Sequence, residues 1–303
     1  MKRLTVKNLN VKYRYGALAV SDLTFFAEKG VTCILGAEES GKTSLLKAIA
    51  GLIKPISGEV YFDETPSEQL RLRDRNVCLI YEDGGFFERK TALYNLQYPL
   101  KVRKTTEMDM AQAIEAATEI VGFKPEDLNT PVNKLTKEKR VLLGYARAFL
   151  RKADVYLIDD VIKDATDRDA LFLQIKPLVE RLADNSIVLY ATDRASECEA
   201  LGGKKIVFLN YGIPIRQGTY AEIKENPTDL MTVEKFLPEA EREGTVLFTD
   251  KNGIYIEAFG KKSYLSQEKL LSDIFLNKEV VVVKTGDGIK VFDQKSERLI
   301  YFG

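Results

Sequence analysis

Residues 36–43 read Gly36-Ala37-Glu38-Glu39-Ser40-Gly41-Lys42-Thr43, which is the G-x-x-x-x-G-K-T spacing of a phosphate-binding loop. In such a loop the glycines let backbone N–H groups curl around a polyphosphate, the lysine reaches the β- and γ-phosphates, and the final hydroxyl holds Mg²⁺. We therefore expect residues 36–43, together with Ser44 directly after them, to bind a nucleotide.

The sequence on both sides of this loop supports the prediction. Val31 to Leu35 is an apolar run typical of a buried strand, and apolar residues recur at helical spacing after Thr43. The order strand, loop, helix puts the phosphates at a helix N-terminus. Glu38 and Glu39 are unusual, because they place two carboxylates inside an anion-binding loop.

Composition and charge exclude several classes of protein. The chain has 303 residues, with 45 Lys+Arg against 45 Asp+Glu, so no overall field favours nucleic acid as a partner. No apolar run approaches the roughly 18 residues needed to span a bilayer, so a protein that works at a membrane would be peripheral. The sequence contains no histidine, so any mechanism must proceed without an imidazole.

The three cysteines, Cys33, Cys78 and Cys198, are far apart and have no metal-binding spacing. We expect reduced thiols in a cytosolic protein.

The order of elements predicts an α/β core followed by a smaller domain. Strand-like runs alternate with helical patterns through residues 1–237, which favours a largely parallel sheet, and residues 90–152 are mostly helical in pattern. A charged linker, residues 238–244, precedes short strand patterns separated by turns. We expect domains at 1–237, with a helical subdomain at about 83–152, and at 245–303, the latter β-rich.

A second element of phosphate chemistry is the buried strand pattern that ends at Ile158-Asp159. An acidic residue at a strand end downstream of a phosphate loop is how P-loop proteins hold Mg²⁺. Asp159 is therefore a predicted metal ligand beside Thr43.

In this order of motifs, most of residues 1–236 resembles the ATP-binding cassette (ABC) ATPases. Residues 36–43 match the family's Walker A loop and residues 155–160 its Walker B strand, while residues 79–87 and 91–96 resemble the Q-loop region of import-type members. The resemblance implies ATP and Mg²⁺ as ligands, Tyr15 as the aromatic that stacks on adenine, and a P-loop core with mixed sheet and helical subdomain. Residues 291–300 resemble the end of the β-rich regulatory domain of sugar-importer ATPases.

The chain departs from the family pattern at positions that carry chemistry. Glu82 occupies the position of the family's Q-loop glutamine, Asp160 that of its catalytic glutamate, and Asp193 that of its switch histidine. The resemblance implies catalytic roles at these three positions and a metal contact for Glu82. Asp160 is one methylene shorter than glutamate, and the resulting retreat of about 1.5 Å can cost on the order of 10²-fold in rate.

The signature motif is altered as well. Thr136 replaces its serine, and Lys137 and Glu138 replace its two glycines, with Lys139 following. By resemblance, Thr136, Lys137, Glu138 and Lys139 would face the nucleotide of a partner cassette. Side chains at glycine positions hinder the close approach of a backbone to that nucleotide.

Three functions remain open at this point. The first is the ATP-binding subunit of an ABC transporter, import type, peripheral on the cytoplasmic face of the cell membrane, dimerising and contacting membrane permease subunits. The second is a non-hydrolysing regulatory subunit that pairs with an active ATPase. The third, a soluble module of translation or DNA repair, is disfavoured because the sequence has neither a second cassette nor a long coiled coil nor a basic stripe.

Overall fold

The computed structural model describes residues 1–13, 16–81, 84–240, 242–243, 245–250, 253–266, 280–285, 288–294, 296 and 298–302. Its contacts divide the chain into two compact units, Met1–Thr219 and Tyr220–Gly303. The predicted fold class, an α/β core with a small β-rich part after it, is confirmed. The predicted domain limits at 237 and 245 stay a prediction.

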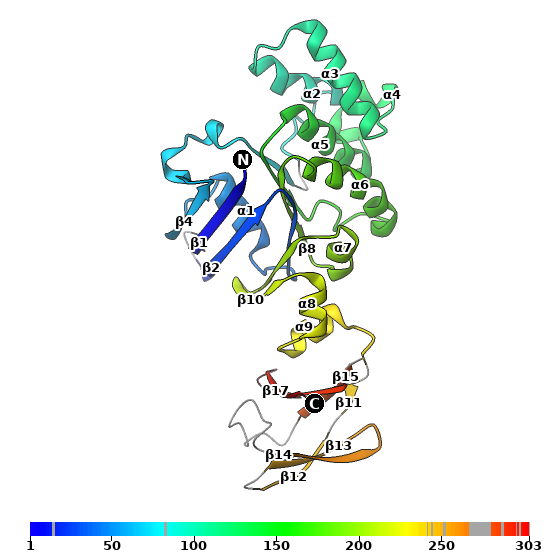
Figure 1. Ribbon diagram of the computed structural model, residues 1–303. Coiled ribbons are helices and arrows are strands. Elements are labelled where there is room, and N and C mark those ends of the chain that lie inside the picture. Colours follow the sequence, from blue (N-terminus) through cyan, green and yellow to red (C-terminus); the bar gives the residue numbers. More distant parts are fainter. Residues whose placement is uncertain are drawn as a thin grey trace. The chain divides into compact units, whose positions relative to one another are not determined.

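A six-stranded mixed sheet is the centre of the first unit (Figure 1). Its order is β10-β9-β3-β8-β7-β6, with β9, β3, β8, β7 and β6 parallel and β10 antiparallel to β9. The strands are β3 (Gly30–Leu35), β6 (Val77–Tyr81), β7 (Val155–Asp159), β8 (Ile187–Thr192), β9 (Lys205–Asn210) and β10 (Ile213–Gly218). Every residue of β7 and β8 is buried, as the continuous apolar runs predict.

A second, antiparallel sheet has the order β2-β1-β4-β5. Its strands are β1 (Arg3–Lys12), β2 (Leu18–Glu28), β4 (Ser57–Phe62) and β5 (Thr65–Pro66). Buried residues alternate with exposed ones along β2, because one face packs on the core and the other meets solvent. Helix α1 (Lys42–Ala50) contributes Leu45, Leu46 and Ile49 to the core that joins both sheets.

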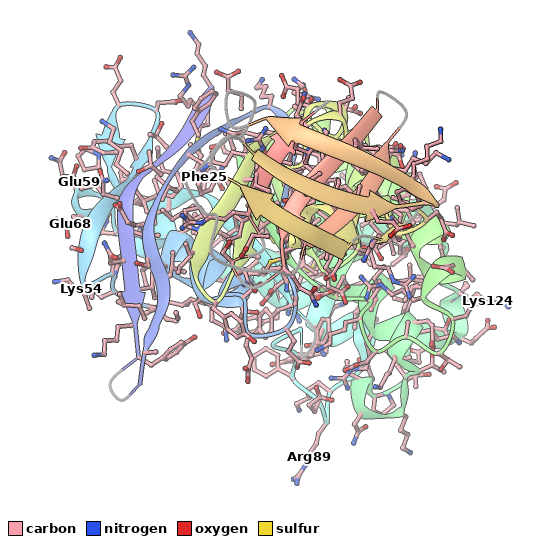
Figure 2. All side chains as sticks on the ribbon, turned by 90° about the horizontal axis from the view of Figure 1, so that it is seen from below. Phe25, Lys54, Glu59, Glu68, Arg89 and Lys124 are labelled. Carbon is pink, nitrogen blue, oxygen red and sulfur yellow. The ribbon has the colours of Figure 1, made fainter. Side chains whose placement is uncertain are left out.

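Four of the remaining helices of the first unit lie between β6 and β7 in the chain. Figure 1 shows α2, α3 and α4 together at one end of this unit. The helices are α2 (Ala92–Val102), α3 (Glu107–Ile120), α4 (Pro125–Leu128), α5 (Lys137–Arg151), α6 (Arg168–Ala183) and α7 (Ala195–Ala200), with short 3-10 turns at Ser67–Gln69, Leu72–Arg75 and Val132–Lys134. Figure 2 shows Arg89 and Lys124 extending away from the fold, as solvated charges do. Across the described ranges, no helix has both the length and the apolar character required to cross a bilayer.

In the residues of the second unit that the structure describes, there are two short helices and two small sheets. The sheet orders are β11-β15-β16-β17 and β12-β13-β14, and residues of both, among them Ile256, Leu265 and Val282, share one hydrophobic core. The elements are α8 (Tyr220–Glu225), α9 (Leu230–Phe236), β11 (Arg242–Glu243), β12 (Thr245–Asp250), β13 (Gly253–Ala258), β14 (Lys261–Ser266), β15 (Val280–Thr285), β16 (Gly288–Asp293) and β17 (Leu299–Phe302). The expected linker at 238–244 thus contributes strand β11, which pairs with β15.

The loop before α2 is fastened to the helices by two polar side chains. Asn95 on α2 is buried; its Oδ1 accepts from the Phe87 N–H at 2.8 Å, and its Nδ2 donates to the carbonyls of Phe87 and Thr91 at 3.3 and 2.9 Å. Arg147 on α5 donates to the carbonyls of Gly84 and Gly85. The loop is therefore held from both α2 and α5.

We expect Asn95→Ala to lower the free energy of unfolding by about 2–3 kcal/mol, because three hydrogen bonds of about 1 kcal/mol each are lost and the Phe87 N–H is left unpaired. Urea unfolding of the purified chain measures this change. Asn185→Ala, at an exposed turn, is the matched control and should change stability by less than about 0.5 kcal/mol. Equal effects of the two substitutions would contradict this account of the loop.

Candidate nucleotide-binding site

The site lies where parallel strands end. Leu35 pairs with Thr192 across β3 and β8, and Asp159 pairs with Ala191 across β7 and β8. Parallel strands in this register bring the residues that follow them to one edge of the sheet. In open α/β sheets this carboxyl edge is where ligands bind.

The loop between β3 and α1 has the shape of a phosphate cradle. Gly41 has φ +96°, and a Cβ there would lie 2.1 Å from the Ala19 carbonyl oxygen. A Cβ on Gly36 would lie 2.3 Å from Ser40 Oγ, so neither glycine can be replaced without movement. Ser40 is buried, and its Oγ has no hydrogen-bond partner among the described residues. A buried hydroxyl that has no partner in the described part of the chain, close to Gly36, fits a loop that binds a phosphate oxygen.

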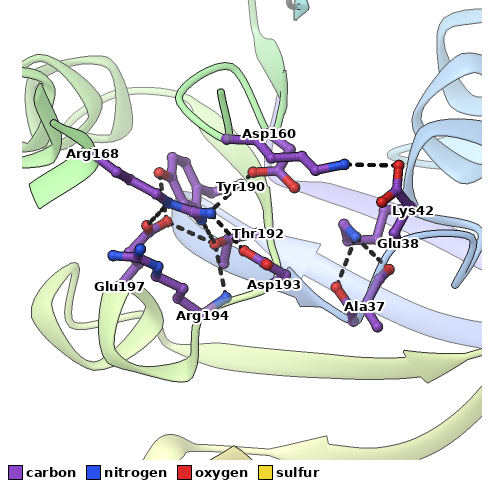
Figure 3. Close-up of polar contacts among 12 residues, drawn as sticks. Ala37, Glu38, Lys42, Asp160, Arg168, Tyr190, Thr192, Asp193, Arg194 and Glu197 are labelled. Carbon is purple, nitrogen blue, oxygen red and sulfur yellow. Dashed lines mark hydrogen bonds and ion pairs between the residues drawn. The ribbon is translucent and has the colours of Figure 1, made fainter. Parts of the chain in front are cut away.

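Lys42, Thr43 and Asp159 are brought together as the sequence predicts. The Lys42 ammonium donates to the carbonyls of Gly36 and Ala37 at 2.7 and 2.8 Å, which holds it inside the loop (Figure 3). Burial lowers its pKa, an effect opposed by the nearby carboxylates of Asp160, Asp193 and Asp159. Thr43 Oγ1 donates to Asp159 Oδ1 at 2.9 Å. Burial raises the pKa of Asp159, while this hydrogen bond opposes the rise.

A cavity of about 500 Å³ joins the loop to three strand-end carboxylates. Its lining contains most of the predicted nucleotide contacts, namely Glu38, Glu39, Ser40, Gly41, Lys42, Thr43, Ser44, Asp159, Asp160 and Asp193, and also Ala19, Lys47, Tyr81 and Lys163. Glu38 is mostly exposed and pairs with Lys163 at 2.8 Å. The negative charge of Glu38 is therefore partly neutralised by Lys163, which also lines the cavity.

Asp160 and Asp193 are held by an arginine that the sequence did not single out. Arg168, the first residue of α6, has its Nη1 2.8 Å from Asp193 Oδ1 and its Nη2 3.6 Å from Asp160 Oδ1 (Figure 3). Its Nε donates to Glu197 Oε1 at 2.7 Å. Burial raises the pKa of Asp160 to about 6, and the Arg168 charge opposes that rise. Asp160 also has φ +45°, a left-handed conformation that aspartate tolerates better than most residues.

The predicted signature residues lie at the start of α5. Thr136 is the N-cap, and its Oγ1 accepts from the Lys139 N–H at 3.3 Å. The Lys139 ammonium pairs with Asp127 at 2.6 Å, while Lys137 is exposed. Hydrogen bonds, including one from Thr136, lower the pKa of Glu138. Two other predicted site residues, Tyr15 and Glu82, lie outside the described residues.

A glycine-rich loop between a parallel strand and a helix, with an acidic strand end beside it, defines a P-loop nucleotide-binding fold. Residues 20–163 match the sequence pattern of the ABC transporter family, and the chain carries an ABC transporter domain.

Curated relatives agree with this assignment. The sn-glycerol-3-phosphate import ATP-binding protein UgpC of Psychromonas ingrahamii is 30% identical over 239 residues, which cover 76% of this chain and 61% of the relative. The trehalose/maltose import ATP-binding protein MalK of Thermococcus litoralis is 27% identical over 220 residues, covering 70% of this chain and 58% of the relative. The chain spans about three fifths of the length of these relatives.

The fold agrees with a solved structure. The dimeric structure of MJ0796, a bacterial ABC transporter cassette, matches 71% of this chain and 98% of its own, with a TM-score of 0.65 and 22% identity. At this level of identity the match establishes the cassette fold alone.

The raised pKa of Asp160 makes stability depend on pH. Because the pKa is about 6 in the folded state against 3.8 ordinarily, the folded chain binds more protons between about pH 4 and pH 6. The free energy of unfolding therefore falls as pH rises through this window. We expect Asp160→Asn to abolish this pH dependence. The free energy of unfolding of the variant, relative to that of the wild type, should therefore rise by up to about 3 kcal/mol between pH 4 and pH 7.

Urea unfolding at several pH values, without nucleotide or metal, measures this difference. Asp164→Asn, at an exposed aspartate four residues on, is the control. Parallel stability curves for the wild type and Asp160→Asn would contradict the burial of a titrating carboxyl at this position.

Proposed function

We propose that the chain is the ATP-binding subunit of an ABC transporter of the import type. The observation that carries the proposal is the hydrogen bond from Thr43 to Asp159 in the cavity that Lys42 also lines. This arrangement joins a phosphate cradle, a cation and a pair of oxygen ligands within one cavity. The matched relatives are named as import ATP-binding proteins, which supports import.

Mg²⁺ fits the oxygen atoms of Thr43 and Asp159, since this ion is usually bound by one or two carboxylates together with substrate phosphates and water. When bound, it would offset charge on the phosphate oxygens. The chain's own contribution is to hold the hydroxyl of Thr43 and the carboxylate of Asp159 2.9 Å apart at the start of α1. Glu82 stays a proposed further ligand.

For hydrolysis we propose slow turnover with Asp160 as the group that orients and deprotonates water. A carboxyl with a pKa of about 6 is mostly ionised at pH 7.5 and can accept a proton. Asp193 lines the same cavity at the proposed switch position, but an ionised carboxylate cannot donate a hydrogen bond to a phosphate. The site therefore has a general base but lacks a hydrogen-bond donor to the phosphate at position 193, which favours a low rate of ATP hydrolysis.

A second candidate is a non-hydrolysing subunit that pairs with an active ATPase. It is favoured by the start of α5, where Lys137 is exposed and Glu138 is partly exposed at positions that the family fills with glycine. Two copies of this chain would present two altered signatures, whereas a heterodimer would present one. Dimerisation through Thr136 to Lys139, as homodimer or heterodimer, is part of both candidates.

We further propose contacts with membrane permease subunits, a peripheral location on the cytoplasmic face of the membrane, and a cassette limited to residues 1–237. Residues 245–303 would then form a regulatory or dimerisation domain. The relatives are named for different cargo, a glycerol phosphate and a disaccharide, so the transported compound is left open.

ATP binding should depend on Lys42. We expect Lys42→Met to weaken ATP binding by about 10²-fold, because the buried ammonium is the charged donor of the loop, while the apolar stem is kept. Equilibrium binding of a fluorescent ATP analogue, with Mg²⁺, measures this loss. Lys54→Met, at the exposed lysine labelled in Figure 2, is the matched control and should leave binding unchanged.

Steady-state phosphate release from the same samples separates the two candidates. Slow release that Lys42→Met abolishes supports the ATPase, and ATP binding without release supports the regulatory subunit. Wild-type protein that binds no ATP would contradict both.

A further inference from the structure

Arg168 is a permanently charged side chain that is only 8% exposed. Burial lowers its pKa, but the hydrogen bond and charge of Glu197, with the charges of Asp193 and Asp160, raise it above its ordinary value. A buried arginine needs such partners, because an unpaired charge in the interior is strongly destabilising.

One edge of the guanidinium is anchored away from the cavity carboxylates. Nε donates to Glu197 Oε1 at 2.7 Å and Nη2 donates to Thr192 Oγ1 at 3.0 Å. Glu197 is itself fixed, since its Oε2 accepts from the hydroxyls of Tyr190 at 3.0 Å and Thr192 at 2.7 Å. The planar group is therefore held in one orientation by β8 and α7.

The other edge faces the two acids of the cavity wall. Nη1 lies 2.8 Å from Asp193 Oδ1, and Nη2 lies 3.6 Å from Asp160 Oδ1. Figure 3 shows Arg168 reaching both carboxylates, with Lys42 across the cavity from them. Arg168 thus pairs with residues that follow two different strands, closely with Asp193 and more loosely with Asp160, beside the place where Lys42 would meet the outer phosphates.

Two carboxylates at this wall oppose a triphosphate more than a diphosphate. The phosphate-loop lysine reaches the β- and γ-phosphates, so a γ-phosphate would lie between Lys42 and these two carboxylates. A diphosphate has no γ-phosphate and does not extend there. At an effective dielectric constant of about 20, one full charge about 6 Å away changes an affinity by roughly 10²-fold. Arg168 offsets part of this repulsion, because its one positive charge is shared between the two aspartates and Glu197.

We propose that Arg168 is a positioning residue that raises the affinity of this site for a nucleoside triphosphate relative to a diphosphate, by holding Asp160 and Asp193 at the cavity wall and offsetting part of their charge. The inference rests on the proposed nucleotide binding and deepens it. Arg168 acts through the two aspartates and is not itself assigned a contact with the nucleotide.

The test is the ratio of ATP affinity to ADP affinity in the full chain, measured by calorimetry with Mg²⁺. We expect Arg168→Met to lower this ratio by about 10- to 100-fold, with ADP affinity changed by less than about threefold. Adding Asp193→Asn to that variant should restore most of the ratio, because one uncompensated charge is removed. A purely structural role would reduce both affinities alike and would show no such rescue.

Arg194→Met is the matched control, since the Arg194 guanidinium pairs instead with the exposed Asp169 at 2.6 Å. Its ratio should equal that of the wild type. If Arg168→Met does not fold, the single variant Asp193→Asn tests the proposal. It should raise the ratio of ATP affinity to ADP affinity, because one negative charge is removed and Arg168 is then less neutralised. An unchanged ratio overturns the proposal. Equal losses for ATP and ADP in a folded Arg168→Met also overturn it, whereas a wild type that binds neither nucleotide overturns the proposed function instead.

Discussion

The parallel pairing of β3 with β8, and of β8 with β7, is the constraint on which the rest of the site depends. Hydrogen bonding in this register brings the ends of three strands to one edge, so that residues 36, 160 and 193 become neighbours. A slip of one residue would draw a polar residue that follows a strand, such as Asp160, into the buried part of the sheet. The complete burial of β7 and β8 makes such a slip costly, and the same burial gives the carboxylates their low-dielectric surroundings.

Within that frame the site is governed by the competition between desolvation and pairing. Asp159 and Asp160 have raised pKa values because burial disfavours their charged forms, and each has a local partner that opposes the rise: the hydroxyl of Thr43 for Asp159 and the guanidinium of Arg168 for Asp160. Lys42 shows the opposite shift: burial lowers the pKa of its ammonium, and the nearby carboxylates, including those of Asp159 and Asp160, oppose this decrease. Charges of both signs are thus retained in the interior because each is partly compensated.

The sequence predicts the fold and the phosphate loop well because both depend on local patterns. The loop residues, the buried strand at 155–159 and the helix after Thr43 follow from spacing and periodicity that short windows contain. Arg168 could not be predicted in this way. Its partner Glu197 is 29 positions away, and an arginine after an N-cap aspartate is ordinary on a solvated helix face. Only the tertiary meeting of α6 with α7 reveals the cluster.

The second unit illustrates the same limit. The sequence predicts a β-rich region at 245–303, which agrees with β15, β16 and β17, but it does not predict helix α9. Val233 of α9 packs with Val283 and Phe292 in a shared cluster. Those contacts group α9 with the C-terminal strands, although the sequence pattern alone places it with the cassette.

The cavity wall carries two aspartates, Asp160 and Asp193, at positions where the family has other residues. Asp160 stands where the family has a glutamate and keeps its charge, whereas Asp193 stands where the family has a histidine and adds a negative charge beside a polyanion. Arg168 contacts both, so the electrostatic effect of each acid depends on the other and on the arginine between them. Groups in one network couple energetically, and changing one member alters the worth of the rest. Restoring histidine at position 193 alone would leave Arg168 less compensated and next to a second possible cation. The three residues therefore act as one unit, and in our proposal that unit raises the affinity for a triphosphate relative to a diphosphate.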